Sequence, residues 1–191
     1  TGDELKSIGE VLESGQIYDS NRYTLYGMLK RLDVDILDMG VVPDDKGQLR
    51  QTLIDASTQA DVVITSGGVS VGDADYVKEM LAELGQVDFW KIAMRPGRPL
   101  AFGQINDALF FGLPGNPVSV MVTFYQFVTP ALRQLMGEAN TEALTLQVVC
   151  TDAIRKRPGR FEYQRGILST NSEGITQVAT TGGQGSGILR S

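Results

Sequence analysis

Asp61-Val62-Val63-Ile64-Thr65-Ser66-Gly67-Gly68-Val69-Ser70-Val71-Gly72-Asp73-Ala74-Asp75-Tyr76 is the stretch that decides the fold class. It opens with a short apolar run of the kind that is buried on both faces of a parallel sheet. A loop of small residues follows, and from Tyr76 to Leu84 the apolar residues recur at helical spacing. A strand that feeds a small-residue loop and then a helix is typical of an α/β domain.

The same alternation of strands and helices surrounds this stretch. Ser20 or Asn21 can cap a helix that carries Leu25, Met28, Leu29 and Leu32 on one face. Further elements are predicted as strands at 34–42 and 87–93, a hairpin of 100–104 with 108–112, and a long helix from Pro117 to Met136 with a kink or break at Pro130. We therefore predict a three-layer, doubly wound α/β domain with a mostly parallel sheet.

The pattern changes near residue 140. The stretches 145–151, 161–169 and 175–179 favour strands, and no helical period follows. We place one domain at residues 1–140 and a partial small β domain at 141–191, because about fifty residues are few for an independent core. The opening Thr1-Gly2-Asp3 turn normally leaves a strand, so we expect the chain to be a piece of a longer protein.

Composition narrows the possible chemistry. Among 191 residues there is no His and one Cys, which excludes an internal disulfide, Ser-His-Asp triads and the usual nitrogen-ligated metal sites. We expect a cytoplasmic protein, because no signal pattern and no membrane-length apolar run occurs. The net charge of −6 argues against nucleic acid or an anionic membrane as a partner.

Positive charge is nevertheless concentrated in two clusters. Lys91, Arg95 and Arg98 form the first, and its prolines and glycine would hold the arginine forks ready for a tetrahedral oxyanion. The second cluster, which can also be read as solvated surface charge, consists of Arg155, Lys156, Arg157, Arg160 and Arg165. Confined basic clusters in an acidic protein suit a small anionic ligand.

The small-residue loop is itself a candidate anion site. Backbone N–H groups can approach an anion at Ser66, Gly67, Gly68 and Ser70, and the following helix N-terminus adds partial positive charge. The loop lacks the glycine spacing of the dinucleotide fingerprint and the lysine of a P-loop. Asp73 is as well explained as a helix cap, whereas Asp75 suggests magnesium binding or catalysis.

Pro114-Gly115-Asn116-Pro117-Val118-Ser119 is a third candidate loop, between a strand and a helix. Alone it could be a structural turn capped by Asn116. Together with the other two loops, each at a predicted strand end, it points to a shared anion-binding cleft.

These motifs, in this order, resemble the molybdopterin molybdenumtransferase family, which includes MoeA and the E domain of gephyrin. The resemblance also takes in Thr1-Gly2-Asp3-Glu4, Asp19-Ser20-Asn21, Pro158-Gly159-Arg160 to Arg165, and Gly185-Ser186. It implies that adenylylated molybdopterin is hydrolysed with Mg²⁺ and that molybdate is inserted at the dithiolene. It also implies a homodimer with a cleft shared between subunits, and the adenylyltransferase is a candidate partner. The chain would lack the N-terminal domains and the end of the C-terminal domain.

The resemblance also implies residue roles. Asp75 and Glu4 would hold the metal, and the catalytic set would be Asp75, Glu4, Asp44 and Lys91. The substrate-binding set would be Ser66, Gly67, Gly68, Ser70, Arg95, Arg98, Pro114, Asn116, Pro117, Ser119, Arg165 and Ser186. Arg95 and Arg98 stand where the family usually has lysine, so a forked contact replaces a point charge.

Three other functions stay open at this point. Adenylylation of molybdopterin by ATP uses the same fold and a similar glycine loop, although the β segment and the Arg95–Arg98 loop favour insertion. A scaffold that binds protein segments would need an apolar groove in the β segment. A general nucleotide pyrophosphatase would have no use for the cation loop.

Overall fold

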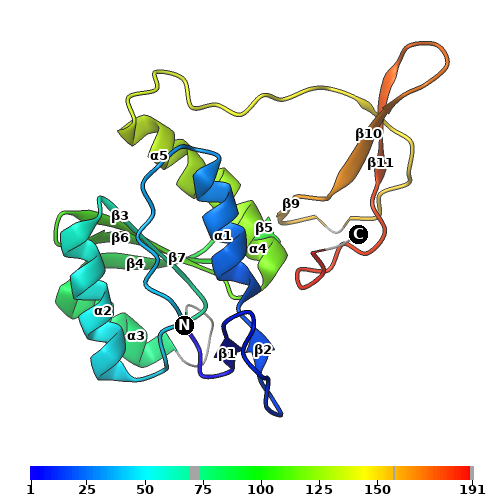
Figure 1. Cartoon of the computed structure of the whole chain (residues 1–191). Coiled ribbons are helices and arrows are strands. Elements are labelled where there is room, and N and C mark those ends of the chain that lie inside the picture. The colour runs from blue at the N-terminus through cyan, green and yellow to red at the C-terminus, as the bar shows by residue number, and fades with distance from the viewer. Residues whose placement is uncertain (69–73, 157, 190–191) are drawn as a thin grey trace.

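The computed structural model describes residues 1–68, 74–156 and 158–189, and for residues 74–76 and 79 it describes the backbone only. Figure 1 shows an α/β part and a smaller β part joined by an extended connection after the last helix. The strands of the α/β part are β1 (Leu5–Lys6), β2 (Ile17–Tyr18), β3 (Val62–Ser66), β4 (Gly85–Lys91), β5 (Met94–Arg95), β6 (Pro99–Ile105) and β7 (Ala108–Leu113). Its helices are α1 (Ser20–Lys30), α2 (Lys46–Gln59), α3 (Ala74–Leu84), α4 (Pro117–Thr123), the π-helical η1 (Phe124–Val128) and α5 (Thr129–Leu135).

The central sheet has helices on both faces, which confirms the three-layer α/β class. Its strand order is β3-β7-β6-β4. On one face α2 and α3 bury Leu53 and Leu81 against the sheet, and on the other α1, α4 and η1 bury Met28, Val120 and Phe124. The apolar positions predicted for α1 and α3 therefore lie on the sides of those helices that face the core.

The sheet is mixed, whereas the sequence pattern predicted a mostly parallel one. Within the described strands β3 pairs with β7 in parallel, and β7–β6 and β6–β4 are both antiparallel. The cause is the tight turn at Asn106, which takes a φ of +50° and returns the chain at once as a hairpin. Two short connections leave no room for the crossover helix that a parallel pair needs.

The strand predicted at Val34 to Val42 is not formed. The segment is extended but has no ladder partner in the described part of the chain. A cavity of about 160 Å³, bordered by Ile36, Leu37 and Met39, lies between this segment, α1, α2 and the edge strand β3. Because backbone pairing requires strands about 5 Å apart, the segment packs through its side chains instead.

The long helix predicted from Pro117 to Met136 is continuous in the structure and changes type along its length. Thr129 N–H donates to Phe124 O, an i to i+5 bond, just before Pro130. Pro130 has no N–H to donate. The wider π turn before it accommodates the lost hydrogen bond, so the helix continues. The predicted kink thus takes the form of a π-helical turn.

The β part contains a small sheet of order β10-β11-β8, formed by β8 (Val149–Cys150), β10 (Gly166–Thr170) and β11 (Thr176–Thr180). Only two residues of the predicted strand 145–151 pair, and most of the sheet is exposed. A separate strand, β9 (Phe161–Glu162), pairs in parallel with β5. This pairing joins the β part to the α/β part.

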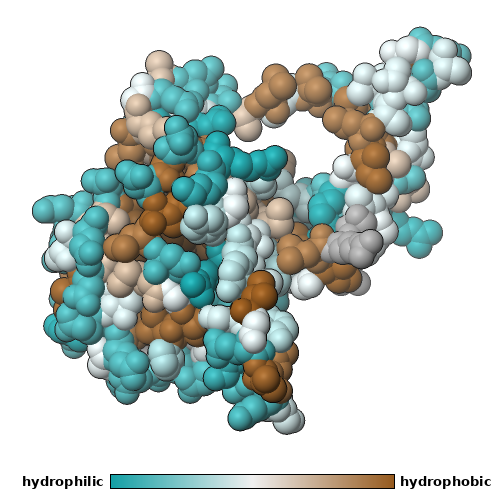
Figure 2. All heavy atoms as spheres, viewed as in Figure 1, coloured by the Kyte–Doolittle hydropathy of each residue, from teal (hydrophilic) through white to brown (hydrophobic). Residues whose placement is uncertain are grey.

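Figure 2 shows hydrophobic side chains at the surface in several places, among them over β1 and β2 and along the connection after α5. They include Ile8, Val11 and Ile17 in the first place and Leu144 and Leu146 in the second. In the described ranges, no helix has the length and hydropathy that a bilayer crossing requires.

The segment at 34–42 is tied to α1 by an ion pair. Arg22 Nε lies 2.7 and 3.0 Å from the two carboxylate oxygens of Asp38, and Arg22 Nη1 donates to Ser7 Oγ at 3.2 Å. The hydrogen bonds from Arg22 hold the pKa of Asp38 below its ordinary value of 3.8. This pair therefore supplies polar contacts where the ladder is missing.

We expect a double-mutant cycle of Arg22→Ala and Asp38→Ala to give a coupling of about 0.5–1 kcal/mol in the free energy of unfolding at pH 7, because the pair is partly exposed. The lowered pKa means that this stability is present above pH 3.8 and is lost as pH falls through the folded-state pKa. Denaturant titrations at pH 7 and near pH 3 measure it. Equal coupling at both pH values would contradict the assignment.

Candidate functional site

The parallel pairing of β3 with β7 brings two of the predicted loops to one edge of the sheet. Ser66 is in register with Leu113, and Gly67 N–H donates to Leu113 O at 3.1 Å. The glycine loop therefore begins beside the Pro114 turn. This is the carboxyl edge of the two parallel strands, where open α/β sheets bind ligands.

The opening residues of the chain close over the glycine loop. The Thr1 amino group donates to Ser66 O at 2.9 Å. Gly67 and Gly68 have φ of +83° and +68°, and a β-carbon would lie 2.9 Å from Thr1 O at Gly67 and 3.0 Å from Thr1 Oγ1 at Gly68. Glycine suits both positions because it adopts a positive φ readily and has no β-carbon to meet Thr1.

Carboxylates collect next to this loop. Asp44 N–H donates to Asp3 Oδ1 at 2.9 Å. Burial raises the pKa of Asp44 above its ordinary value, and the negative charges of Asp3 and Glu4 raise it further. The excess of negative potential is one that a divalent cation would relieve, and Mg²⁺ commonly takes one or two protein carboxylates together with water and phosphate oxygens. Glu4 and Asp44 fit that pattern, although the described residues contain no cluster of three acidic or thiol ligands.

For two predicted site residues the structure does not describe the side chain. Ser70 lies outside the described residues, and so does the Asp73 of the same loop. Asp75 falls in the first turn of α3 by its backbone, and its side chain is not among those described. The assignment of Asp75 to metal and catalysis therefore stays a prediction.

The Pro114–Ser119 turn borders the glycine loop on one side. Asn21 Nδ2 donates to Gly115 O at 2.7 Å, and a β-carbon at Gly115 would lie 3.8 Å from Gly67 Cα. Asn116 occupies the N-cap of α4 but makes no side-chain capping bond, so its amide is not used in the way a structural turn would use it.

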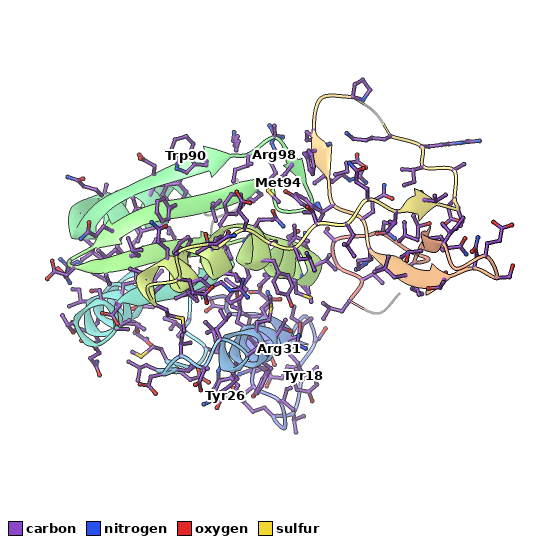
Figure 3. The ribbon with its side chains drawn as sticks, turned by 90° about the horizontal axis from the view of Figure 1, so that it is seen from above. Tyr18, Tyr26, Arg31, Trp90, Met94 and Arg98 are labelled. Atoms are coloured by element: carbon purple, nitrogen blue, oxygen red, sulfur yellow. The ribbon has the colours of Figure 1, made fainter. Side chains whose placement is uncertain are left out.

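On the other side of the same turn lies a basic pocket of about 430 Å³. It is formed between the loop after β4 and the β part, which is where Figure 3 places Met94 and Arg98. We call it the arginine pocket, and it is lined by Met94, Arg95, Pro96, Gly97, Arg98, Ser119, Arg155, Arg160, Glu162, Tyr163, Gln164, Gln184, Gly185 and Ser186. Four guanidinium groups face one acidic side chain, Glu162, which lies 3.7 Å from Arg95.

The arginine-bearing loop is fixed at both ends. Ile92 N–H donates to Arg98 O at 2.8 Å, which closes the loop, and Tyr163 N–H donates to Arg95 O at 2.8 Å. Gly97 has a φ of +92°, and a β-carbon there would lie 2.7 Å from Thr123 Cγ2. The backbone of the loop thus packs closely against α4, and the side chains of Arg95 and Arg98 line the pocket.

The structure brings some of the predicted binding residues together and separates others. Arg95, Arg98, Ser119 and Ser186 line the arginine pocket. Lys91 ends β4 opposite Pro99, is exposed and does not line it. Arg165 does not line the pocket, and its guanidinium donates to the carbonyls of Gly183 and Ile188.

Sequence reasoning missed several lining residues. Arg155 and Arg160 belonged to a noted basic cluster but were not assigned to the site, and Tyr163 and Gln184 were not singled out. The β9 pairing with β5 brings this region to the first basic cluster, and a two-residue strand leaves almost no signal in a sequence.

Comparison with known proteins matches two family models to successive parts of the chain. Residues 1–134 match the model of a probable molybdopterin binding domain, and residues 147–191 match the MoeA C-terminal region (domain IV). The molybdopterin molybdenumtransferase of Haemophilus influenzae is 47% identical over 190 residues, which are 99% of this chain and 47% of that protein. The chain belongs to the molybdopterin molybdenumtransferase family.

Two further relatives agree with this membership. Gephyrin of Dictyostelium discoideum is 38% identical over 221 aligned residues, covering 97% of this chain and 31% of that protein. The crystal structure of the MoeA protein of Pyrococcus horikosii aligns with a TM-score of 0.71 at 30% identity over 94% of this chain and 43% of that one. The chain thus spans less than half the length of these molybdenumtransferase family members.

We expect Gly97→Ala to destabilise the protein more than Gly137→Ala. Both glycines have positive φ, of +92° and +87°, but nothing lies within 4 Å of a β-carbon at Gly137. Each substitution should cost about 1–2 kcal/mol for the left-handed backbone, and Gly97→Ala a further ~1–3 kcal/mol for the contact with Thr123.

Denaturant unfolding of the two variants measures the difference. Equal losses would show that the arginine loop does not pack on α4 as described.

Proposed function

We propose that this chain carries the molybdate-insertion site of a molybdopterin molybdenumtransferase. The full-length protein would bind adenylylated molybdopterin, hydrolyse its phosphoanhydride to release AMP, and place molybdate on the dithiolene. Family membership supports the general class of reaction, and the residues described above support the division of labour that follows.

The observation that carries the proposal is the position of the Pro114–Ser119 turn. One side of the turn contacts the glycine loop, with Gly115 beside Gly67, and the other side supplies Ser119 to the arginine pocket. A phosphate-binding loop and an oxyanion pocket therefore share one wall. A substrate with a phosphate at one end and a metal-accepting group at the other can lie across it.

At the glycine-loop end, the loop residues Ser66, Gly67, Gly68 and Ser70 would hold the phosphate of the substrate. The N–H groups of Gly68 and Ser70 would be the donors, because Gly67 N–H is bonded to Leu113 O. Glu4, Asp44 and Asp75 would hold Mg²⁺. When bound, the ion would withdraw charge from the phosphoanhydride and lower the pKa of a bound water. Pro114 and Pro117 stiffen the turn, and Asn116 keeps a free amide next to it.

At the other end, molybdate is a tetrahedral dianion that meets several guanidinium groups. Arg98, Arg155 and Arg160 make no ion pair in the described structure, and Glu162 only partly neutralises Arg95 at 3.7 Å. An incoming dianion would therefore be attracted by several positive charges at once and could accept charge-assisted hydrogen bonds from them. Ser119 and Ser186 would add neutral hydrogen bonds, and Lys91 would steer the anion from the rim.

We also propose the finer features of the family for the full-length protein: a cytoplasmic homodimer that receives its substrate from the adenylyltransferase. The support is indirect. The chain covers less than half the length of these relatives. Parts of the full-length protein outside this chain would therefore supply the remaining residues of the cleft.

Full-length protein with Mg²⁺, adenylylated molybdopterin and molybdate is expected to form molybdenum cofactor. Asp75→Ala should lower the rate at least 10–100-fold, which is the effect of losing even an outer-shell partner of a metal site. Asp107→Ala, in the turn between β6 and β7, is the matched control and should keep full activity.

If the intact protein instead adenylylates molybdopterin with ATP and needs no molybdate, the insertion proposal is wrong. Hydrolysis of ordinary dinucleotides would identify a general pyrophosphatase.

Arg98→Ala should raise the half-saturating molybdate concentration about 10–100-fold, because it removes one charge-assisted contact. Arg98→Lys should retain most of the affinity, and Arg50→Ala, on the exposed side of α2, should change nothing. Steady-state rates over a molybdate series measure this. A normal response in Arg98→Ala would place the oxyanion elsewhere.

A further inference from the structure

Gln184 makes an unusually complete set of hydrogen bonds for a side chain in a terminal loop. Its Oε1 accepts from Arg165 N–H at 2.9 Å, and its Nε2 lies 3.1 Å from Arg165 O. The same Nε2 lies 2.9 Å from Thr181 O and 3.0 Å from Thr181 Oγ1. Both the donor and the acceptor of the amide are therefore engaged with two neighbouring backbone positions.

These bonds continue the β10–β11 ladder past its last pair. Gly166 is in register with Thr180, and Thr181 N–H then donates to Arg165 O at 3.0 Å. At the next position the chain turns away, and the Gln184 amide takes the place that a strand residue would occupy beside Arg165. The Gln184 side chain thereby links the turn after β11 back to Thr181 and to Arg165, the residue before β10.

This turn determines where the next residues lie. Gly185 and Ser186 line the arginine pocket, and Ser186 O accepts from Val118 N–H at 2.9 Å. Val118 is in the first turn of α4, where backbone N–H groups have no partner within the helix. The Arg165 guanidinium holds the same loop from the other side, at the carbonyls of Gly183 and Ile188.

A glutamine is well suited to this position. Glutamate cannot donate, so its carboxylate would face the carbonyls of Arg165 and Thr181. Alanine removes every contact, and asparagine is one methylene shorter. The identity of the side chain, and not only its polarity, is thus specified by the geometry.

We propose that Gln184 is a positioning residue of the arginine pocket, which holds the 181–188 loop so that Ser186 is seated on the N-terminus of α4 beside Arg98. It acts through Ser186 and does not itself touch the reacting atoms. The consequence for molybdate rests on the proposed function, whereas the seating of the loop does not.

The test uses the full-length protein and the variants Gln184→Glu, Gln184→Asn and Gln184→Ala, with Gln51→Ala as control. Gln51 bonds Asp55 on the exposed side of α2, far from the loop in sequence. Residue-resolved hydrogen–deuterium exchange reports the Val118 amide, and Val120, which donates to Asn116 O within the same helix, is the internal reference. The rates are then measured over a molybdate series and a pterin-substrate series.

In Gln184→Glu we expect Val118 to exchange at least tenfold faster while Val120 is unchanged. The half-saturating molybdate concentration should rise about tenfold, and that of adenylylated molybdopterin should stay within about twofold. Gln184→Asn should show the same changes to a smaller degree, and it serves as the test if Gln184→Glu does not fold.

Unchanged protection of Val118 in all three variants would overturn the proposal, and so would faster exchange with an unchanged molybdate response. Equal losses for both substrates would indicate general unfolding and would also overturn it. If the wild-type protein shows no response to molybdate, the proposed function fails, and the exchange of Val118 alone then decides whether Gln184 seats the loop.

Discussion

The parallel register of β3 with β7 is the constraint on which the rest of the site depends. Because Ser66 lies opposite Leu113, the glycine loop and the Pro114 turn leave the sheet together, and Gly67 N–H bonds Leu113 O. A shift of β3 by one residue against β7 would turn β3 over and move its side chains to the opposite face of the sheet. The two loops would then separate, and α4 would begin at a different point relative to the glycines. The buried Phe110 and Leu113 fix this register energetically.

The arginine pocket shows how an acidic protein can keep a strongly cationic site. The guanidinium groups come from two segments far apart in sequence, and the fold brings both segments to one pocket. Their heads remain partly solvated, so the repulsion between them is screened and costs little in the absence of a ligand. Glu162 moderates the charge at Arg95 and leaves Arg98 unpaired among the described residues. The charge is thus available to a ligand without a large penalty on folding.

Local patterns predicted much of this structure and long-range pairings little of it. The hairpin of β6 and β7 follows from its turn residues, and the apolar faces of α1 and α3 follow from short-range periodicity. The run at 62–64 forms the predicted strand, but it lies at the edge of the sheet and only its Val63 is buried, not both of its faces. The segment at Val34 has strand-like composition, but composition does not supply a neighbour to pair with. The sheet was predicted to be mostly parallel, although the predicted hairpin already required one antiparallel pair of strands. The pairing of β5 with β9 and the role of Gln184 depend on contacts across tens of residues, which one sequence without aligned relatives does not reveal.

The α/β part and the β part differ in folding pattern, but one helix contacts both of them. The continuous α4–η1 helix carries Thr123, against which Gly97 packs. It also carries Val118, whose N–H is bonded by Ser186, and Gln126, whose Oε1 accepts from Tyr163 OH at 3.1 Å. Any tilt of the β part must therefore break hydrogen bonds at the same helix that supports the arginine loop. The helix follows directly from the Pro114 turn, so the turn beside the glycine loop and one wall of the arginine pocket belong to one continuous segment. The distance between the glycine loop and the arginine pocket is then set by the fold itself, and the proposed substrate, held at both ends, would require such a fixed distance.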